Sequence, residues 1–74
     1  MNRTRRKALA DIQEQLEALK DQLDALKDEE EEYRDNIPES MTEKQEKAEE
    51  VCDNLSYAFD SMEEAISYIE EATK

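Results

Sequence analysis

The apolar residues in the first half of the chain recur at alternating steps of three and four. They form two rows whose members lie seven residues apart, and Glu30 is the one polar residue among them. This spacing puts both rows on one side of an α-helix and is typical of a coiled-coil seam. The Leu9 row comprises Leu9, Leu16, Leu23 and Glu30, and the Ile12 row comprises Ile12, Leu19, Leu26 and Tyr33.

The second half of the chain repeats the sevenfold spacing and adds a third row. Three neighbouring rows widen the apolar face to about 100°, which is more than a single partner helix needs to cover. The Ala48 row comprises Ala48, Leu55, Met62 and Ile69, the Val51 row comprises Val51, Ala58, Ala65 and Ala72, and the Cys52 row comprises Cys52, Phe59 and Ile66.

A helix break is predicted between the two halves, at Asn36 to Ser40. Pro38 disfavours helical geometry at the residue before it, and Asn36 can end the first helix. Ser40 and Glu43 have the spacing of a capping box that starts the second. We therefore predict a single all-α domain over residues 1–74, a two-helix antiparallel coiled-coil hairpin with helices at about 4–35 and about 41–73.

The register of this hairpin can be predicted by pairing large residues with small ones. If paired residue numbers sum to 81, Leu9, Leu16 and Leu23 each face an alanine of the second helix. Facing a large side chain with a small one lets two backbones approach closely and fills the core. The expected partners of the three leucines are Ala72, Ala65 and Ala58.

The Cys52 row is left unused by this register. A lone hairpin has a thin core, so this row is expected either to join two hairpins as a four-helix homodimer or to dock another protein. We take Cys52, Phe59 and Ile66 as the candidate interface. Tyr57, on the polar side, is either a further anchor or an isolated exposed aromatic. Cys52 itself is expected to be a small buried hydrophobe, with a disulfide across the dimer as the alternative.

Charge restricts the partners further. The net charge is −12, and residues 8–74 carry six basic and all 22 acidic residues, a net charge of −16. This field disfavours direct nucleic-acid binding and favours a partner with a basic surface. The basic N-terminal cluster comprises Arg3, Arg5, Arg6 and Lys7. It is expected to pair with Glu70 and Glu71 across the hairpin; contact with nucleic acid or an anionic membrane is the alternative.

No group of residues predicts catalysis, a metal site or a cofactor. The acidic run from Asp28 to Glu32 lies on one helix, where successive side chains point about 100° apart, so it indicates a solvated face or weak cation binding. Glu30 occupies the seam opposite Val51. It either reaches the edge with help from Arg34 or acts as a polar notch that fixes register. We expect a protein that is not an enzyme.

The chain has one cysteine, no histidine and no long apolar stretch. These features leave disulfide frameworks and the common zinc sites without residues, and they predict neither secretion nor membrane insertion. A cytoplasmic location is the expectation.

Three stretches together resemble a group of small acidic helical-hairpin proteins of Gram-positive phages and prophages. They are Asn2 to Leu9, the acidic run ending in Tyr33-Arg34-Asp35-Asn36-Ile37-Pro38-Glu39, and the tail with Tyr-Ile-Glu-Glu-Ala. The resemblance implies a helical hairpin and a phage or prophage setting.

Two functions fit the sequence. The first is a non-enzymatic protein–protein interaction module that self-associates. The second is an acidic mimic of DNA that inhibits a host DNA-binding or defence protein. A hairpin dimer would carry roughly one charge per 2 Å, close to the one per 1.7 Å of duplex DNA.

Overall fold

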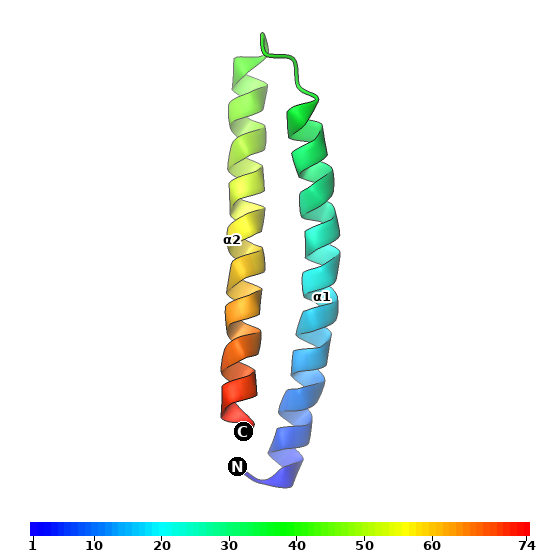
Figure 1. Cartoon of the computed structure of the whole chain (residues 1–74), viewed down its shortest axis with the longest axis vertical. Coiled ribbons are helices and arrows are strands. Elements are labelled where there is room, and N and C mark those ends of the chain that lie inside the picture. Colours follow the sequence, from blue (N-terminus) through cyan, green and yellow to red (C-terminus); the bar gives the residue numbers. More distant parts are fainter.

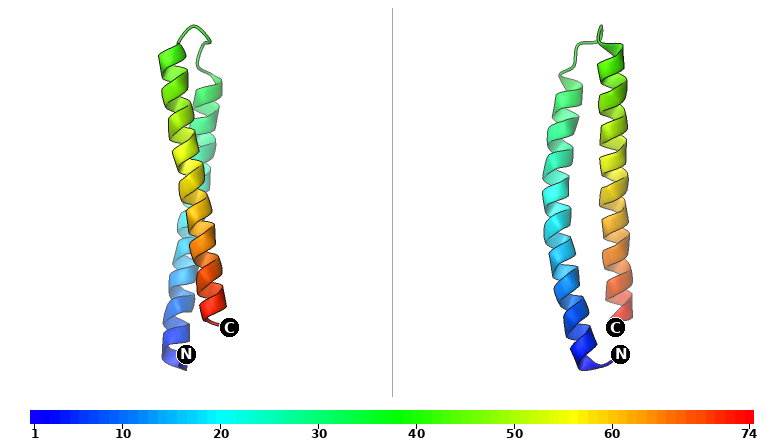
Figure 2. Two further views of the ribbon diagram at one scale, coloured as in Figure 1. Left: turned by 90° about the vertical axis from the view of Figure 1, so that its left-hand side faces the viewer. Right: turned by 180° about the vertical axis from the view of Figure 1, so that it is seen from behind.

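The computed structural model describes residues 1–74 and contains two helices and no strand, as predicted. Helix α1 spans Arg3–Asp35 and helix α2 spans Thr42–Ala72. Figure 1 shows the chain running along α1, turning, and returning along α2, with both termini at the end opposite the turn. The molecule is a rod with extents of 59 × 15 × 12 Å, and Figure 2 shows the helices crossing at a shallow angle.

Helix α1 is capped at both ends by asparagine side chains. Asn2 Oδ1 accepts a hydrogen bond of 2.8 Å from the backbone N–H of Arg5, which satisfies one of the free donors of the first turn. Asn36 is the C-cap, and its Nδ2 donates to the carbonyl oxygen of Glu32 at 2.9 Å. The helix therefore begins one residue before the predicted start and ends at Asp35, with Asn36 as its C-cap, as the sequence indicates.

Helix α2 begins at Thr42, one residue after the predicted start, but it is capped differently from the prediction. Its N-cap is Met41, which makes no side-chain capping hydrogen bond, so the predicted capping box of Ser40 and Glu43 is wrong. Ser40 instead lies inside a tight turn, in which the N–H of Met41 donates to the carbonyl oxygen of Pro38 at 2.9 Å. Ile37 closes the end of the hairpin: its side chain is buried, and its carbonyl accepts a hydrogen bond from Gln45.

The Cys52 row lies inside the hairpin. Only four of the 74 residues are buried, and two of them, Cys52 and Ile66, belong to this row, which leaves them 2% and 7% exposed. Phe59 between them is half-buried. The prediction that this row is left unused is therefore wrong, and Cys52 and Ile66 are not available on the surface of the hairpin as an interface.

The predicted pairing of leucines with alanines is also wrong. Ala58, Ala65 and Ala72 are exposed, whereas an alanine facing a leucine across the seam would be covered. The observed pairs are Gln13 with Glu70 and Lys20 with Glu63, whose residue numbers both sum to 83. A small change of register thus accompanies a rotation that brings a different flank of each helix into contact.

Candidate interaction surface

The side of α1 that faces α2 is partly polar. The Gln13 row lies beside the Leu9 row and is half-buried along the length of the hairpin. Long cationic side chains can lay an aliphatic stem over apolar surface while the charged group reaches water. This allows a polar row to cover the Cys52 row of α2. The Gln13 row comprises Gln13, Lys20, Lys27 and Arg34.

Phe59 shows how this covering works. The ammonium groups of Lys20 and Lys27 lie 5.5 and 5.4 Å from the centre of its ring, within the range of a cation–π attraction. Lys20 also pairs with Glu63 of α2, and Lys27 pairs with Asp24 and Glu31 of its own helix. Both lysines therefore act as part of the hairpin's core and not as free surface charges.

Glu30 is half-buried in the seam, as its heptad position predicts, but Arg34 does not assist it. Arg34 Nε instead donates to Asp35 Oδ1 at 3.2 Å. This hydrogen bond raises the pKa of the Arg34 guanidinium, so the group stays charged at every pH that the fold meets. The version of the prediction in which Arg34 lifts Glu30 to the edge is therefore wrong.

The Ile12 row, predicted to lie in the seam, is on the surface. Its four large side chains are between 47% and 56% exposed. In heptad letters the Leu9 and Ala48 rows are position a, the Ile12 and Val51 rows are position d, and the Gln13 and Cys52 rows are position e. Positions d and e flank position a on a helix, so the Ile12 row lies on the opposite side of the Leu9 row from the Gln13 row. The structure thus leaves one complete row of large apolar side chains without a partner within the hairpin.

The Val51 row of α2 lies on the same face of the hairpin as the Ile12 row. In both helices the inward-facing rows occupy positions a and e, and the Ile12 and Val51 rows occupy position d. When a chain reverses direction, equivalent flanks of its two helices come to the same face. Large side chains of α1 and small side chains of α2 therefore share one surface. We call the Ile12 and Val51 rows together the open face.

The rows beside the open face carry little charge, although 43% of the chain's residues are charged. On α1 the adjoining position g holds Ala8, Gln15, Gln22 and Glu29, and on α2 it holds Lys47, Asn54, Ser61 and Tyr68. The opposite face is strongly acidic. Its positions b and f hold Glu14, Glu17, Asp21, Asp24, Asp28, Glu31 and Asp35 of α1 and Glu46, Glu49, Asp53, Asp60, Glu63 and Glu70 of α2.

The hairpin exposes more surface than its size requires. Its accessible area is 5786 Å², whereas a compact monomer of this mass has about 4,700 Å². The difference of about 1,000 Å² is close to the roughly 800 Å² that each partner buries in a standard protein–protein interface. A second molecule on one face would bring the exposed area into the usual range.

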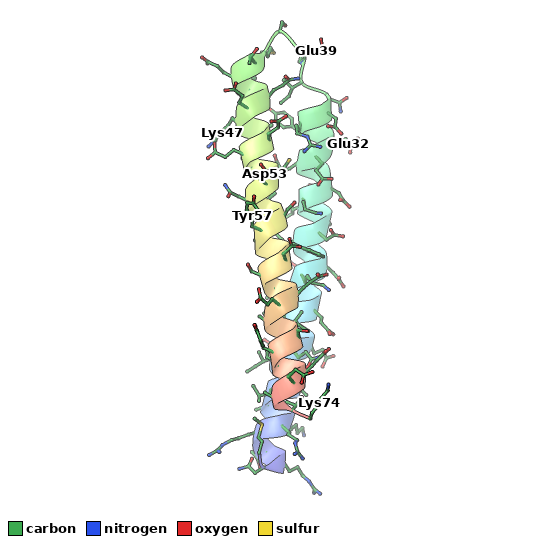
Figure 3. The ribbon with its side chains drawn as sticks, turned by 60° about the vertical axis from the view of Figure 1, so that its left-hand side comes forward. Glu32, Glu39, Lys47, Asp53, Tyr57 and Lys74 are labelled. Carbon is green, nitrogen blue, oxygen red and sulfur yellow. The ribbon has the colours of Figure 1, made fainter.

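The basic N-terminal cluster is exposed and makes none of the predicted ion pairs. Arg3, Arg5, Arg6 and Lys7 take part in no salt bridge. The two expected acceptors are engaged elsewhere: Glu70 Oε1 accepts from Gln13 at 3.0 Å, and Glu71 pairs with Lys74 at 2.8 Å. Figure 3 shows Lys74 near this end of the rod and Glu39 at the other.

The acidic run from Asp28 to Glu32 is divided around the helix. Within it, Glu31 pairs with Lys27 at 3.9 Å, and no group of three carboxylate or thiol side chains is placed to hold a metal ion. The surface has two shallow hollows, and neither lies between the helices. One is lined by α2 alone and the other by residues 40–44.

Tyr57 and Tyr68 are the most exposed aromatic side chains, at 67% each. Tyr68 donates to Glu64 at 3.3 Å on its own helix. Tyr57 lies at position c, on the side of α2 turned away from α1, and its side chain makes no hydrogen bond within the hairpin (Figure 3). It is separated from Cys52 and Ile66, so the predicted four-residue interface is not one surface.

The sequence predicted the five apolar rows, but the wrong flank of each helix was placed inward and the Gln13 row was missed. The signal that could have corrected this choice is the difference in side-chain size between the two flanks of α2. The Cys52 row offers cysteine, phenylalanine and isoleucine, whereas the Val51 row offers three alanines. The bulkier flank buries more apolar area against α1. Placing it inward leaves the alanines, and with them the Ile12 row, on the outside.

Neither helix has a segment long and apolar enough to cross a membrane. No protein-family model, curated protein or solved structure matches this chain.

Proposed function

We propose that this chain is a non-enzymatic protein–protein interaction module that self-associates through its open face. The observation that carries the proposal is the exposure of Ile12, Leu19, Leu26 and Tyr33 along one side of α1. Contiguous apolar surface on a soluble protein marks a site of association. The hairpin is an antiparallel coiled-coil unit that dimerises into a four-helix bundle, as two hairpins with wide apolar faces commonly do.

The rotation of α1 supports this proposal. A hairpin that functions alone would gain by turning α1 about 50°, which would move the Ile12 row inward and the Gln13 row outward. The observed orientation keeps the Ile12 row free and covers Phe59 with lysine stems. This is the orientation that a helix needs when it packs against two neighbours at once, one within the chain and one outside it.

The biological setting is proposed from the resemblance alone. The Asn-Ile-Pro-Glu turn after the acidic run supports a phage or prophage protein that works in the cytoplasm. A partner with a basic surface would complement the acidic face, which the self-associating unit leaves outward.

A second candidate function is mimicry of DNA by that acidic face. The observation in its favour is the gathering of thirteen of the 22 acidic residues at positions b and f, opposite the open face. Competition between the hairpin and duplex DNA for a DNA-binding protein, weakened by salt, would support this function. Binding that does not respond to salt would contradict it.

Self-association is tested by light scattering over a concentration series. We expect the natural chain to be a dimer, and Leu19→Arg to be a monomer at the same concentrations because it places two charges in the interface. Ala18→Arg is the matched control: it adds the same charge to the neighbouring residue, which is exposed and points away from the open face. Equal masses for the two variants, or a natural chain that stays monomeric, would contradict the proposal.

A further inference from the structure

We infer that the second copy docks with a two-fold axis parallel to the helices, so that the Ile12 row of each copy packs on the Val51 row of the other. This inference rests on the proposed function and adds the arrangement of the two copies. The rows, their exposure and the internal register of the hairpin determine it.

A two-fold axis parallel to the helices allows no sliding along the rod. Each residue keeps its height, so α1 of one copy lies over α2 of the other with the register that α1 and α2 have within one chain. That register is given by Gln13 opposite Glu70 and Lys20 opposite Glu63. The heights of facing rows in the dimer are therefore already determined by the monomer.

At these heights every large residue of the Ile12 row meets a small one. Leu19 comes level with Ala65 of the other copy, and Leu26 with Ala58, each within one residue, or about 1.5 Å. Ile12 and Ala72 match at one end, and Tyr33 and Val51 at the other. The size complementarity that the sequence suggests for a single hairpin is thus met between two hairpins, where large side chains fill the space above alanines.

The other way to stack two such faces uses a two-fold axis perpendicular to the helices. That arrangement lays the Ile12 row on its own copy and the Val51 row on its own copy. Leucine would then meet leucine, and alanine would meet alanine, so one side would hold the faces apart and the other would be left hollow. Voids between packed helices forfeit contact energy, and this arrangement is therefore disfavoured.

The parallel axis also completes the core. The Leu9 and Ala48 rows lie between the inward flank and the open face and are mostly half-buried in the hairpin. In the dimer they point to the centre of the four helices. The rim is formed by neutral side chains, among them Gln15, Gln22, Asn54 and Ser61, and the acidic faces stay outward. Docking therefore brings few carboxylates together.

The position of the two turns distinguishes the two axes. We would attach a spin label at Glu39→Cys, an exposed turn residue, in a Cys52→Ala background that removes the natural thiol. With a parallel axis both turns lie at one end of the bundle, and the labels should be separated by less than about 30 Å, given helix spacings of about 8–10 Å. A perpendicular axis puts them at opposite ends of a rod 59 Å long.

Disulfide formation gives an independent readout of facing rows. In the same background, we expect an oxidised mixture of Leu26→Cys and Ala58→Cys chains to form mainly the mixed dimer, at least tenfold over either variant cross-linked to itself. A long label distance, or preferential Leu26→Cys self-linking, in a protein that is dimeric by light scattering would overturn the arrangement alone. A monomer with no dipolar coupling would overturn the proposed function as well.

Discussion

The Cys52 row and the Ile12 row differ in their burial. The Cys52 row has three members, and its cysteine and isoleucine are almost fully buried. The Ile12 row is longer, consists of large apolar side chains throughout, and is about half exposed. The hydrophobicity of a row therefore does not by itself decide its burial. The space available on the facing helix decides it as well.

The largest effect is expected from shortening a side chain in the Cys52 row. Ile66→Ala should lower the free energy of unfolding by about 2–5 kcal/mol, since it leaves a cavity in the seam. Chemical denaturation followed by circular dichroism measures this cost. Ile12→Ala is the matched change in the other row: its cost should be small in dilute protein and grow with concentration. Equal costs in dilute, monomeric protein would contradict the distinction between the rows.

The open face is tested by enlarging a small side chain of the Val51 row. Ala65→Leu should weaken dimerisation by about 1–3 kcal/mol through overpacking against Leu19 of the other copy, with helicity unchanged. Analytical ultracentrifugation gives the dissociation constant. Ser67→Leu adds a leucine of the same size on the same helix, outside the open face. If Ala65→Leu strengthened association, the Val51 row would be shown to have empty space above it.

A smaller effect is expected when the charge of Lys20 is removed and its aliphatic stem over Phe59 is kept. Lys20→Met keeps an unbranched apolar stem but removes the cation–π attraction and the ion pair with Glu63, which together are worth about 0.5–1.5 kcal/mol. Thermal melts compare it with Lys20→Ala, which should cost more because the stem is lost as well. Equal melting temperatures for the two variants would mean that the stem contributes nothing.

The smallest effect is expected at Tyr57. Because its side chain is 67% exposed and lies away from both the seam and the open face, Tyr57→Ala should change stability and dimerisation by less than about 0.5 kcal/mol. The same denaturation and sedimentation measurements apply. A clear loss of self-association in this variant would move the interface to the outer side of α2.

Heptad spacing was sufficient to predict the two helices and the half-buried position of Glu30, and Pro38 with Asn36 predicted the break between the helices. Heptad spacing was insufficient to predict the rotation of each helix about its axis. Position a can form a seam together with position d or together with position e, and the spacing does not distinguish the two. Lys20 and Lys27 mislead for the same reason: as charged residues they indicate an outer face, yet their stems cover Phe59. Which flank turns inward depends on both helices together, and that information is not local.

The connection between the two helices was predictable only in part. Asn36 was identified as the residue that ends α1, and the start of α2 was predicted at about residue 41, one residue before Thr42, but the cap of α2 was not predicted. Ser40 has the right side chain for a cap, yet the turn that buries Ile37 takes Ser40 out of capping geometry. Burial of one isoleucine thus overrides a local capping preference worth about 1 kcal/mol.

Because α2 returns to the end at which α1 starts, the two ends of the rod differ: one holds both termini and the other holds the turn. Any peptide or domain joined to either terminus is carried at one pole, and the turn around Pro38 forms the other, as far away as the 59 Å length of the molecule permits. With two copies about a parallel axis, four attachment points gather at a single pole. A fluorescent or affinity tag can therefore be placed on either terminus without approaching the turn, which remains free to meet a surface end-on.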